Sequence, residues 1–218
     1  MVRLETKDVQ IMEDIYAENN TVSEGIQRDL SARGIFAINV LGAPGAGKTS
    51  VLINIVHRLP DITPYVIEGD IQSDIDTQKL KDMGIQSVQI NTYGACHLEG
   101  EQILSTLPRL TLDKPGILFV ENIGNLVCPA EFAIGEHIKM LVCTVTDGAD
   151  KPYKYPLAFE KAAAVLLNKA DLMPYVDFDL AYFTQGVQAL NPNAPIFLVS
   201  AKTGEGFDKV CQWIRAML

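Results

Sequence analysis

A glycine-rich run at residues 42–49 holds the residue types that bind the phosphates of a nucleoside triphosphate. It fits G-x-x-x-x-G-K-[ST], in which backbone N–H groups turn inward around the β-phosphate and glycines tolerate the positive φ angles required. Lys48 would reach the β- and γ-phosphates, and the Thr49 hydroxyl would bind Mg²⁺. We expect a phosphate-binding segment that comprises Gly42, Ala43, Pro44, Gly45, Ala46, Gly47, Lys48, Thr49 and Ser50.

The sequence on either side of this loop agrees with that interpretation. Residues 35–41 are mostly apolar and predict a buried strand, and residues 49–59 predict a helix that stops before Pro60. A helix that begins at the loop points the positive end of its dipole at the phosphates. A chance glycine-rich turn is the alternative, and the strand before it and the helix after it count against that reading.

A second motif, after the apolar run 162–167, indicates which base is bound. Residues 168–171 match N-K-x-D, the guanine-specificity element of GTP-binding proteins. The Asp171 carboxylate can accept hydrogen bonds from N1–H and the 2-amino group of guanine, whereas adenine has neither donor. A buried acceptor left without its donor costs about 1–3 kcal/mol. Asn168 would hold the loop, and the stem of Lys169 would cover the face of the base.

A third element follows the apolar run 195–199. Ser200, Ala201 and Lys202 resemble the short Ser-Ala-Lys element that supports the base through a backbone N–H. The three elements occur in the order found in GTPases, which favours guanine over adenine. We therefore expect GTP and GDP as ligands, and Mg²⁺-dependent GTP hydrolysis. Hydrolysis should be slow, because no free arginine finger or catalytic glutamine is evident near the predicted Mg²⁺ site.

Acidic side chains follow two further apolar runs. Asp70 comes after the predicted strand at 64–67, and it is the first choice for a direct or water-mediated Mg²⁺ contact, with Asp74 the second. Glu121 ends the predicted strand at 116–120, where NTPases orient Mg²⁺-bound or attacking water. For Asp70 and Asp74 the alternative is a helix N-cap and an acidic first turn, and for Glu121 it is a solvated strand end. The predicted catalytic residues are Lys48, Asp70 and Glu121, and the predicted Mg²⁺ ligands are Thr49, Asp70, Asp74 and Glu121.

The four cysteines are not equivalent. Cys143 lies in an apolar run and Cys211 in the last predicted helix, and both fit the core. Cys96, directly followed by His97, and Cys128 lie in predicted loops or at helix starts, so they could converge. Two thiolates and an imidazole suit Zn²⁺ or Ni²⁺. An adjacent Cys-His pair is commonly incidental, and the spacing alone leaves both interpretations open.

Short apolar runs alternate with helical patterns after Gly34, which predicts an α/β fold. We expect the P-loop NTPase fold, a mainly parallel sheet of about seven strands with helices on both faces. All three nucleotide motifs lie at strand ends, where such sheets bind ligands. The predicted strands are 35–41, 64–67, 86–90, 116–120, 139–146, 162–167 and 195–199, and the predicted helices are 49–59, 73–83, 97–107, 177–189 and 206–217.

The N-terminal segment differs from the rest. Apolar residues recur at helical spacing over residues 7–31 and predict one or two amphipathic helices that end at Gly34. No internal repeat, low-complexity segment or linker is evident. We expect residues 1–218 to form a single GTPase domain, with residues 1–34 as a helical extension packed on it.

Composition excludes several classes of protein. The 218 residues carry a formal net charge of -9, so a basic nucleic-acid-binding face is not expected. No apolar run approaches the ~20 residues of a membrane span, and the N-terminus lacks the apolar core of a signal peptide. We expect a cytoplasmic protein that binds neither nucleic acid nor membranes, with its cysteines as thiols or ligands and not disulfides.

Two further stretches carry a resemblance to a known family. Residues 92–99 read TYGACHLE, and residues 121–132 read ENIGNLVCPAEF. With the phosphate loop and residues 168–171, they resemble the HypB family, SIMIBI-class P-loop GTPases that help insert nickel into nickel–iron hydrogenases. The resemblance runs from the N-terminal helix to the loop at 200–202. It implies a GTP-hydrolysing metallochaperone that delivers or regulates nickel and couples GTP-dependent dimerisation to metal binding.

The resemblance also implies ligands and partners. The family's Cys-His pair and its Cys before Pro ligate metal at a dimer interface, and these roles map onto Cys96, His97 and Cys128, with Ni²⁺ or Zn²⁺ bound. The implied partners are a second copy of the chain, a nickel chaperone of the HypA type and the hydrogenase large subunit. Some relatives carry an N-terminal cysteine- or histidine-rich nickel site, which this chain lacks, so tight nickel storage is not expected.

Other functions remain as alternatives. A related accessory GTPase for urease or a cobalamin-dependent enzyme would share most motifs, although the Cys96-His97 spacing and the run at 121–129 count against it. A small-molecule kinase would share the phosphate loop but would not need residues 168–171. A metal-storage module without turnover would bind nickel independently of Lys48.

Overall fold

The computed structural model describes the backbone of residues 6–70 and 75–218, and the side chains of residues 16–69 and 77–218. Within these residues seven strands form one sheet, in the order β3-β2-β4-β1-β5-β6-β7, and all neighbouring strands are parallel. The predicted parallel sheet of about seven strands is confirmed. The strands are β1 (Ile35–Gly42), β2 (Thr63–Asp70), β3 (Gln86–Asn91), β4 (Gly116–Glu121), β5 (Ile138–Thr144), β6 (Ala162–Asn168) and β7 (Ile196–Leu198).

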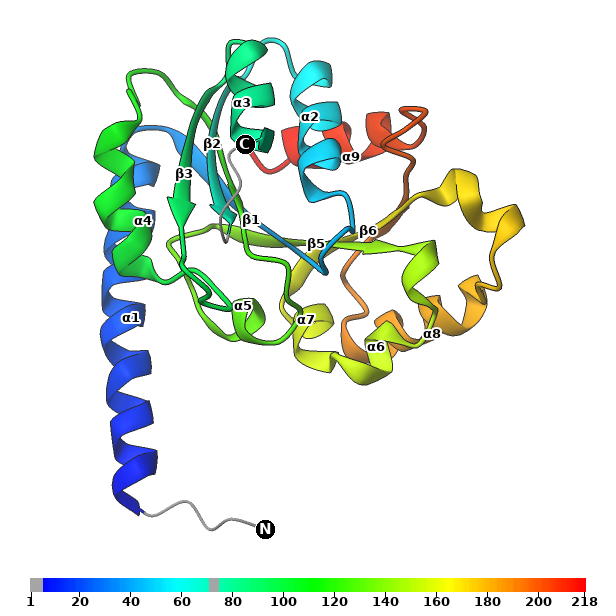
Figure 1. Ribbon diagram of the computed structural model, residues 1–218, viewed down its shortest axis with the longest axis horizontal. Helices are drawn as coiled ribbons and strands as arrows, with labels where there is room; N and C mark the ends of the chain where they lie inside the picture. Colours follow the sequence, from blue (N-terminus) through cyan, green and yellow to red (C-terminus); the bar gives the residue numbers. More distant parts are fainter. Residues whose placement is uncertain (1–5, 71–74) are drawn as a thin grey trace.

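Helices cover both faces of the sheet, as predicted, with α2, α3 and α9 on one side and α5 to α8 on the other (Figure 1). The α-helices are α1 (Thr6–Ala32), α2 (Lys48–Arg58), α3 (Ile75–Asp82), α4 (Gly100–Thr106), α5 (Cys128–Glu131), α6 (Lys151–Lys154), α7 (Pro156–Glu160), α8 (Leu180–Leu190) and α9 (Phe207–Arg215). Short 3-10 turns are η1 (Leu107–Arg109), η2 (Val145–Asp147) and η3 (Ala170–Tyr175).

The alternation of side chains along β1 explains the two covered faces. Ile38 and Val40 pack with residues of α2 and α9. Ala37 points to the opposite face and packs with α1 and α4, and Leu41, on that same face, packs with α7 and α8. Because successive strand residues point to opposite faces, a strand buried on both sides is apolar along most of its length; Asn39 is the polar residue of β1. This is why β1 could be recognised from the sequence.

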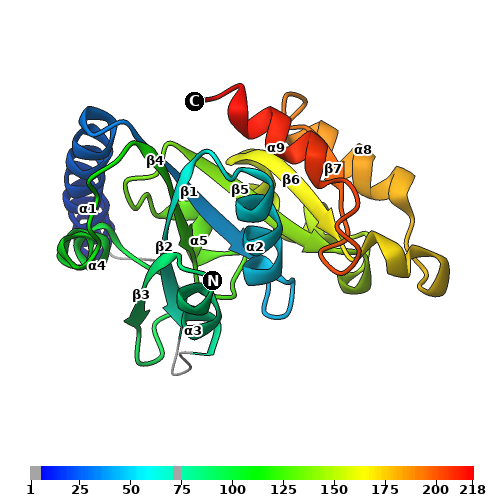
Figure 2. The same ribbon diagram turned by 90° about the horizontal axis from the view of Figure 1, so that it is seen from above.

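The N-terminal segment forms one helix, α1, where the pattern predicted one or two. Its residues Ile26 and Leu30 are buried against β1 and α4, in one cluster with Ile103. Helices α1 and α4 lie side by side at one end of the sheet (Figures 1 and 2). None of the helices in the described part of the chain is long and apolar enough to cross a membrane.

Several predicted boundaries were wrong. The helix predicted at 97–107 begins only at Gly100, because Glu99 and Gln102 form a capping box that fixes its start. His97 therefore lies in a loop. The strand predicted at 139–146 ends at Thr144, whose hydroxyl accepts a hydrogen bond from the Thr146 N–H and turns the chain into η2.

Helix α3 begins at Ile75 in the described chain; residues 73 and 74, which the prediction included, lie outside it. Helices α5, α6 and α7 were not predicted. Each has only four or five residues, which is too short to show a helical repeat in the sequence.

Candidate functional site

The carboxyl ends of β1, β2 and β4 meet at a cavity of roughly 500 Å³. The phosphate loop forms one wall, and residues 121–124 form another. Strand β1 lies in the middle of the sheet, with β4 on one side and β5 on the other. Parallel sheets bind ligands at such central strand ends, because the chain leaves the two neighbouring strands in opposite directions.

The phosphate loop has the backbone that its sequence predicts. Gly45 and Gly47 have φ angles of 74° and 85°, which a residue with a Cβ rarely adopts. Lys48 is the first residue of α2 and is buried, with its Nζ donating to the Gly42 carbonyl at 3.4 Å. The Thr49 hydroxyl donates to Glu121 Oε1 at 3.1 Å. Two predicted Mg²⁺ ligands thus lie in contact.

The other two carboxylates predicted to bind Mg²⁺ are at the end of β2 and shortly after it in the sequence. Asp70 is the last residue of β2, and its side chain, like the whole of Asp74, lies outside the described residues. Glu68 is a further carboxylate that was not singled out. It is buried, lines the cavity, and accepts a hydrogen bond from the Thr77 hydroxyl. The signal that could have singled it out is its position near the carboxyl end of β2, where such sheets bind ligands.

Lys79 of α3 also lines the cavity and was not predicted. Nothing in the sequence marks it, because an exposed helix commonly carries lysines. Its placement depends on the packing of α3 beside β3.

A second cavity of roughly 330 Å³ adjoins the phosphate loop and holds the predicted base-binding elements. Asn168 donates to the Ala46 carbonyl at 2.9 Å and accepts from the Ala201 N–H at 3.0 Å. One amide therefore joins the phosphate loop to the Ser-Ala-Lys loop. The residues that line the cavity are Gly47, Ser50, Asn168, Lys169, Asp171, Leu172, Ala201 and Lys202.

Two charged residues of this cavity are also held in place by hydrogen bonds. Lys169, at a φ of 59°, donates from its Nζ to the Gly45 carbonyl at 2.9 Å. The Ser200 hydroxyl donates to Asp171 Oδ1 at 2.6 Å, which orients the carboxylate. The structure brings all three predicted base elements together, and their role in binding guanine stays a prediction.

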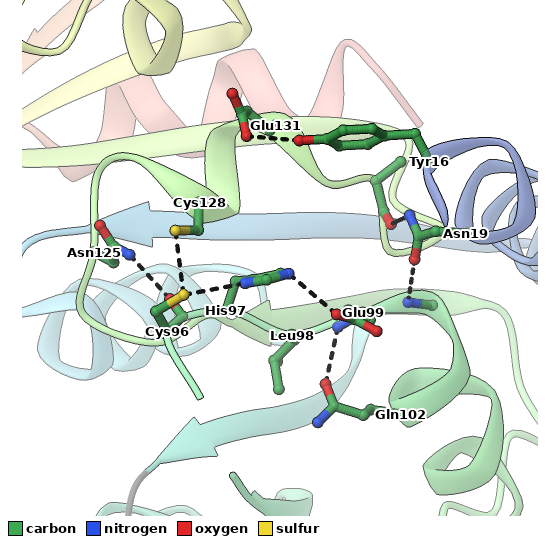
Figure 3. Close-up of polar contacts among 12 residues, drawn as sticks. Tyr16, Asn19, Cys96, His97, Leu98, Glu99, Gln102, Asn125, Cys128 and Glu131 are labelled. Carbon is green, nitrogen blue, oxygen red and sulfur yellow. Dashed lines mark hydrogen bonds and ion pairs between the residues drawn. The ribbon is translucent and has the colours of Figure 1, made fainter. Parts of the chain in front are cut away.

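Cys96, His97 and Cys128 converge outside the nucleotide cavity. Cys96 Sγ lies 3.2 Å from Cys128 Sγ and 3.4 Å from His97 Nδ1 (Figure 3). One donor atom from each of the three residues lies within 4.8 Å of the others. Two sulfurs and an imidazole nitrogen at this spacing fit a soft or borderline divalent ion. The other two cysteines, Cys143 and Cys211, are buried in the core as predicted.

The environment of Cys96 affects its protonation. The hydrogen bond with Cys128, and then burial, raise the pKa of the Cys96 thiol above its ordinary value. His97 stacks on Phe132 with ring centroids 4.1 Å apart, and its Nε2 lies 3.4 Å from a carboxylate oxygen of Glu99. The imidazole is therefore held from two sides.

Asn125 connects this cluster to the phosphate loop. Its Nδ2 donates to the Cys96 carbonyl at 3.1 Å, and its backbone forms an isolated antiparallel bridge with Gly42. Asn122, which is buried, accepts from the Leu98 N–H at 3.2 Å, next to His97. The sequence marked the run that holds both asparagines, but it gave no sign of which backbone groups they bind.

A buried ion pair holds the segment after Cys128. Lys139 lies 3.1 Å from Glu136, and its Nζ donates to the carbonyls of Pro129 and Phe132 at 2.9 and 2.6 Å. Both side chains are largely buried. Sequence reasoning missed this pair because a lysine inside an apolar strand gives no hint of its partner.

Comparison with known proteins agrees with this arrangement. Residues 36–198 match the family described as CobW/HypB/UreG, nucleotide-binding domain. The hydrogenase maturation factor HypB of Escherichia coli strain K12 is 43% identical over 202 residues, which is 92% of this chain and 70% of that protein.

Two solved structures are similar over most of the chain. HypB from Helicobacter pylori, in complex with nickel, has a TM-score of 0.87 at 32% identity, and the match covers 91% of this chain and 94% of that one. HypB from Archaeoglobus fulgidus has a TM-score of 0.86 at 31% identity, over 92% and 98% of the two chains. Family, sequence and fold thus agree: the chain belongs to the HypB family of hydrogenase maturation factors.

Proposed function

We propose that this chain is a GTP-hydrolysing metallochaperone that delivers or regulates nickel during the maturation of a nickel–iron hydrogenase. One observation carries the proposal. The segment at residues 121–128 begins with Glu121 in the phosphate cavity and ends with Cys128 in the thiol–imidazole cluster, and Asn125 between them contacts both sites. A short stretch of backbone therefore links the phosphate cavity to the metal ligand Cys128, so a change in the cavity can move that ligand.

The nucleotide is GTP or GDP with Mg²⁺. Asp171 accepts from the base, and Lys48 places a positive charge at the β- and γ-phosphates. Thr49 and Glu121 would hold the Mg²⁺, with Asp70 and then Asp74 as further candidates. When bound, Mg²⁺ neutralises charge that develops on the phosphate oxygens. Glu121 also positions the attacking water, because it lines the phosphate cavity beside Thr49.

The cargo metal is Ni²⁺, with Zn²⁺ as the competing ion, held by Cys96, His97 and Cys128. Three ligands leave a fourth position, which water or a second copy of the chain completes. Cys96 is exposed, so a second copy can approach it. We infer a GTP-dependent homodimer across this face, and an exchange of metal in the cytoplasm with a nickel chaperone of the HypA type and the hydrogenase large subunit. The nickel complex of the Helicobacter pylori relative supports the choice of metal.

Hydrolysis and mass together test this proposal. The purified chain should hydrolyse GTP but not ATP, with a turnover below the ~1–100 s⁻¹ of kinases. Its mass by light scattering should double when a non-hydrolysable GTP analogue replaces GDP. Equal hydrolysis of ATP and GTP would contradict the guanine assignment, and an unchanged mass would contradict the dimer.

A further inference from the structure

Helix α1 is joined through one buried side chain to both segments that carry the metal ligands. Asn19 accepts a hydrogen bond from the Gly100 N–H at 2.9 Å, just after the segment with Cys96 and His97. Its Nδ2 donates to the Ala133 carbonyl at 2.8 Å, just after the helix that begins at Cys128 (Figure 3). A single amide group thus spans the gap between the two segments.

The packing around Asn19 leaves little freedom. A Cβ at Gly100 would lie 2.9 Å from Ser23 Oγ and 3.3 Å from Asn19 Oδ1. A Cβ at Gly135, on the other segment, would overlap Ile26 Cγ2. The Ser23 hydroxyl adds a second hydrogen bond to the Ala133 carbonyl, at 2.7 Å. The backbone of each segment therefore lies directly against α1, without a side chain between them.

The same helix also supports the imidazole ligand. Phe132 lies between two rings: its centroid is 5.0 Å from that of Tyr16 and 4.1 Å from that of His97, with interplanar angles of 29° and 30°. The Tyr16 hydroxyl donates to Glu131 at 3.0 Å, which fixes the outer ring of this stack (Figure 3). Helix α1 thus contacts the surroundings of all three ligands, although it contributes none itself.

We propose that Asn19 is a positioning residue for the metal site, and that α1 sets the spacing between Cys96 and Cys128. The inference rests on the proposed metal-binding function. Metal–ligand distances tolerate errors of only about 0.2 Å, so a shift of either segment weakens binding. Loss of groups that orient ligands commonly lowers metal affinity by about 10–100-fold.

Two substitutions and a control test the role of Asn19. Asn19→Asp keeps the acceptor for Gly100 but places a carboxylate oxygen against the Ala133 carbonyl, and Asn19→Ala removes both hydrogen bonds. Thr21→Ala is the matched control, because the exposed Thr21 hydroxyl bonds only to the carbonyl of Ala17 in its own helix. GDP affinity and thermal unfolding show whether each variant is folded.

Two measurements are then made on each folded protein. The first is Ni²⁺ affinity by competition with a chelator, which should fall about 10–100-fold in both Asn19 variants and stay unchanged in Thr21→Ala. The second is made without metal: the yield of the fluorescent bridge that dibromobimane forms when it alkylates both Cys96 and Cys128. That yield should fall in the Asn19 variants, while alkylation of each single thiol should not.

The outcomes separate this inference from the proposed function. If wild type binds Ni²⁺ and both Asn19 variants keep its affinity or its bridging yield, the positioning role is wrong and the metal site stands. If wild type does not bind Ni²⁺, the proposed function fails, and the bridging yield still decides the positioning role. If the Asn19 variants do not fold, Asn19→Gln replaces them, because it keeps an amide but moves it one methylene away from the Gly100 N–H and the Ala133 carbonyl. Wild-type affinity and bridging yield in Asn19→Gln would then overturn the inference.

Discussion

At the scale of single residues, the proposed metal site requires the metal to displace the proton on the Cys96 thiol. Its pKa is raised, so Cys96 is protonated in the metal-free protein at neutral pH, and metal binding must release that proton. Lower pH favours the protonated thiol and therefore weakens metal binding. We predict that Ni²⁺ affinity rises by at least about tenfold per pH unit between about pH 6 and pH 8, one factor of ten for each proton released.

Chelator competition at several pH values measures this dependence. Cys128→Ala serves as the reference, because it removes one sulfur and the hydrogen bond that raises the Cys96 pKa. A wild-type affinity that does not vary with pH would contradict binding through Cys96.

At the same scale, the proposed choice of guanine rests on Asp171. Its carboxylate is oriented by Ser200 at 2.6 Å, so replacement by asparagine changes a fixed acceptor into a donor. We predict that Asp171→Asn weakens GTP binding by about tenfold or more and favours xanthosine triphosphate, whose C2 carbonyl accepts from the new amide. Asp177→Asn, at an exposed position outside the cavity, is the control. Unchanged preference for GTP in Asp171→Asn would show that this loop does not read the base.

At the scale of elements, the segment after Cys128 depends on a buried charge. Removal of one partner from a buried ion pair costs about 3–5 kcal/mol, because it leaves the other charge without compensation. We predict that Lys139→Met destabilises the protein by about that much, since Glu136 and two backbone carbonyls lose their donor. Denaturant unfolding measures the change. In the exposed pair of Lys154 and Asp150, Lys154→Met should cost no more than about 1 kcal/mol. Equal effects in the two pairs would contradict this account.

The elements show what a sequence can and cannot predict. The strand β1 and the phosphate loop were recognisable, because a fully buried strand is mostly apolar and the loop geometry needs fixed residue types. The approach of Cys96 to Cys128 was expected from the family resemblance but left open by their spacing alone, because β2 lies between β3 and β4 and the loops after β3 and β4 bring the sulfurs together. Glu68 and Asn19 were not predicted, because a polar residue in a strand or helix is commonly exposed to solvent. Their burial and their contacts follow only from tertiary packing.

At the scale of the whole molecule, the nucleotide cavity and the thiol–imidazole cluster both follow the carboxyl ends of strands, and Asn125 contacts a residue of each. The alternation of strands and helices was enough to predict the sheet's carboxyl edge as the functional one. The packing of α1 beside α4 was not predicted in detail, because an amphipathic pattern shows that a helix has a buried face but not which element covers it.

The central claim is that nucleotide state and metal binding are coupled. Ni²⁺ affinity should be measured in wild type and in Cys128→Ala, each with GDP and with a non-hydrolysable GTP analogue. The account predicts that wild-type affinity differs between the two nucleotides and that Cys128→Ala binds weakly in both. Linkage also requires that Ni²⁺ change the affinity for the GTP analogue, relative to GDP, by the same factor. Equal wild-type affinities in the two nucleotide states, or wild-type affinity in Cys128→Ala, would contradict the account.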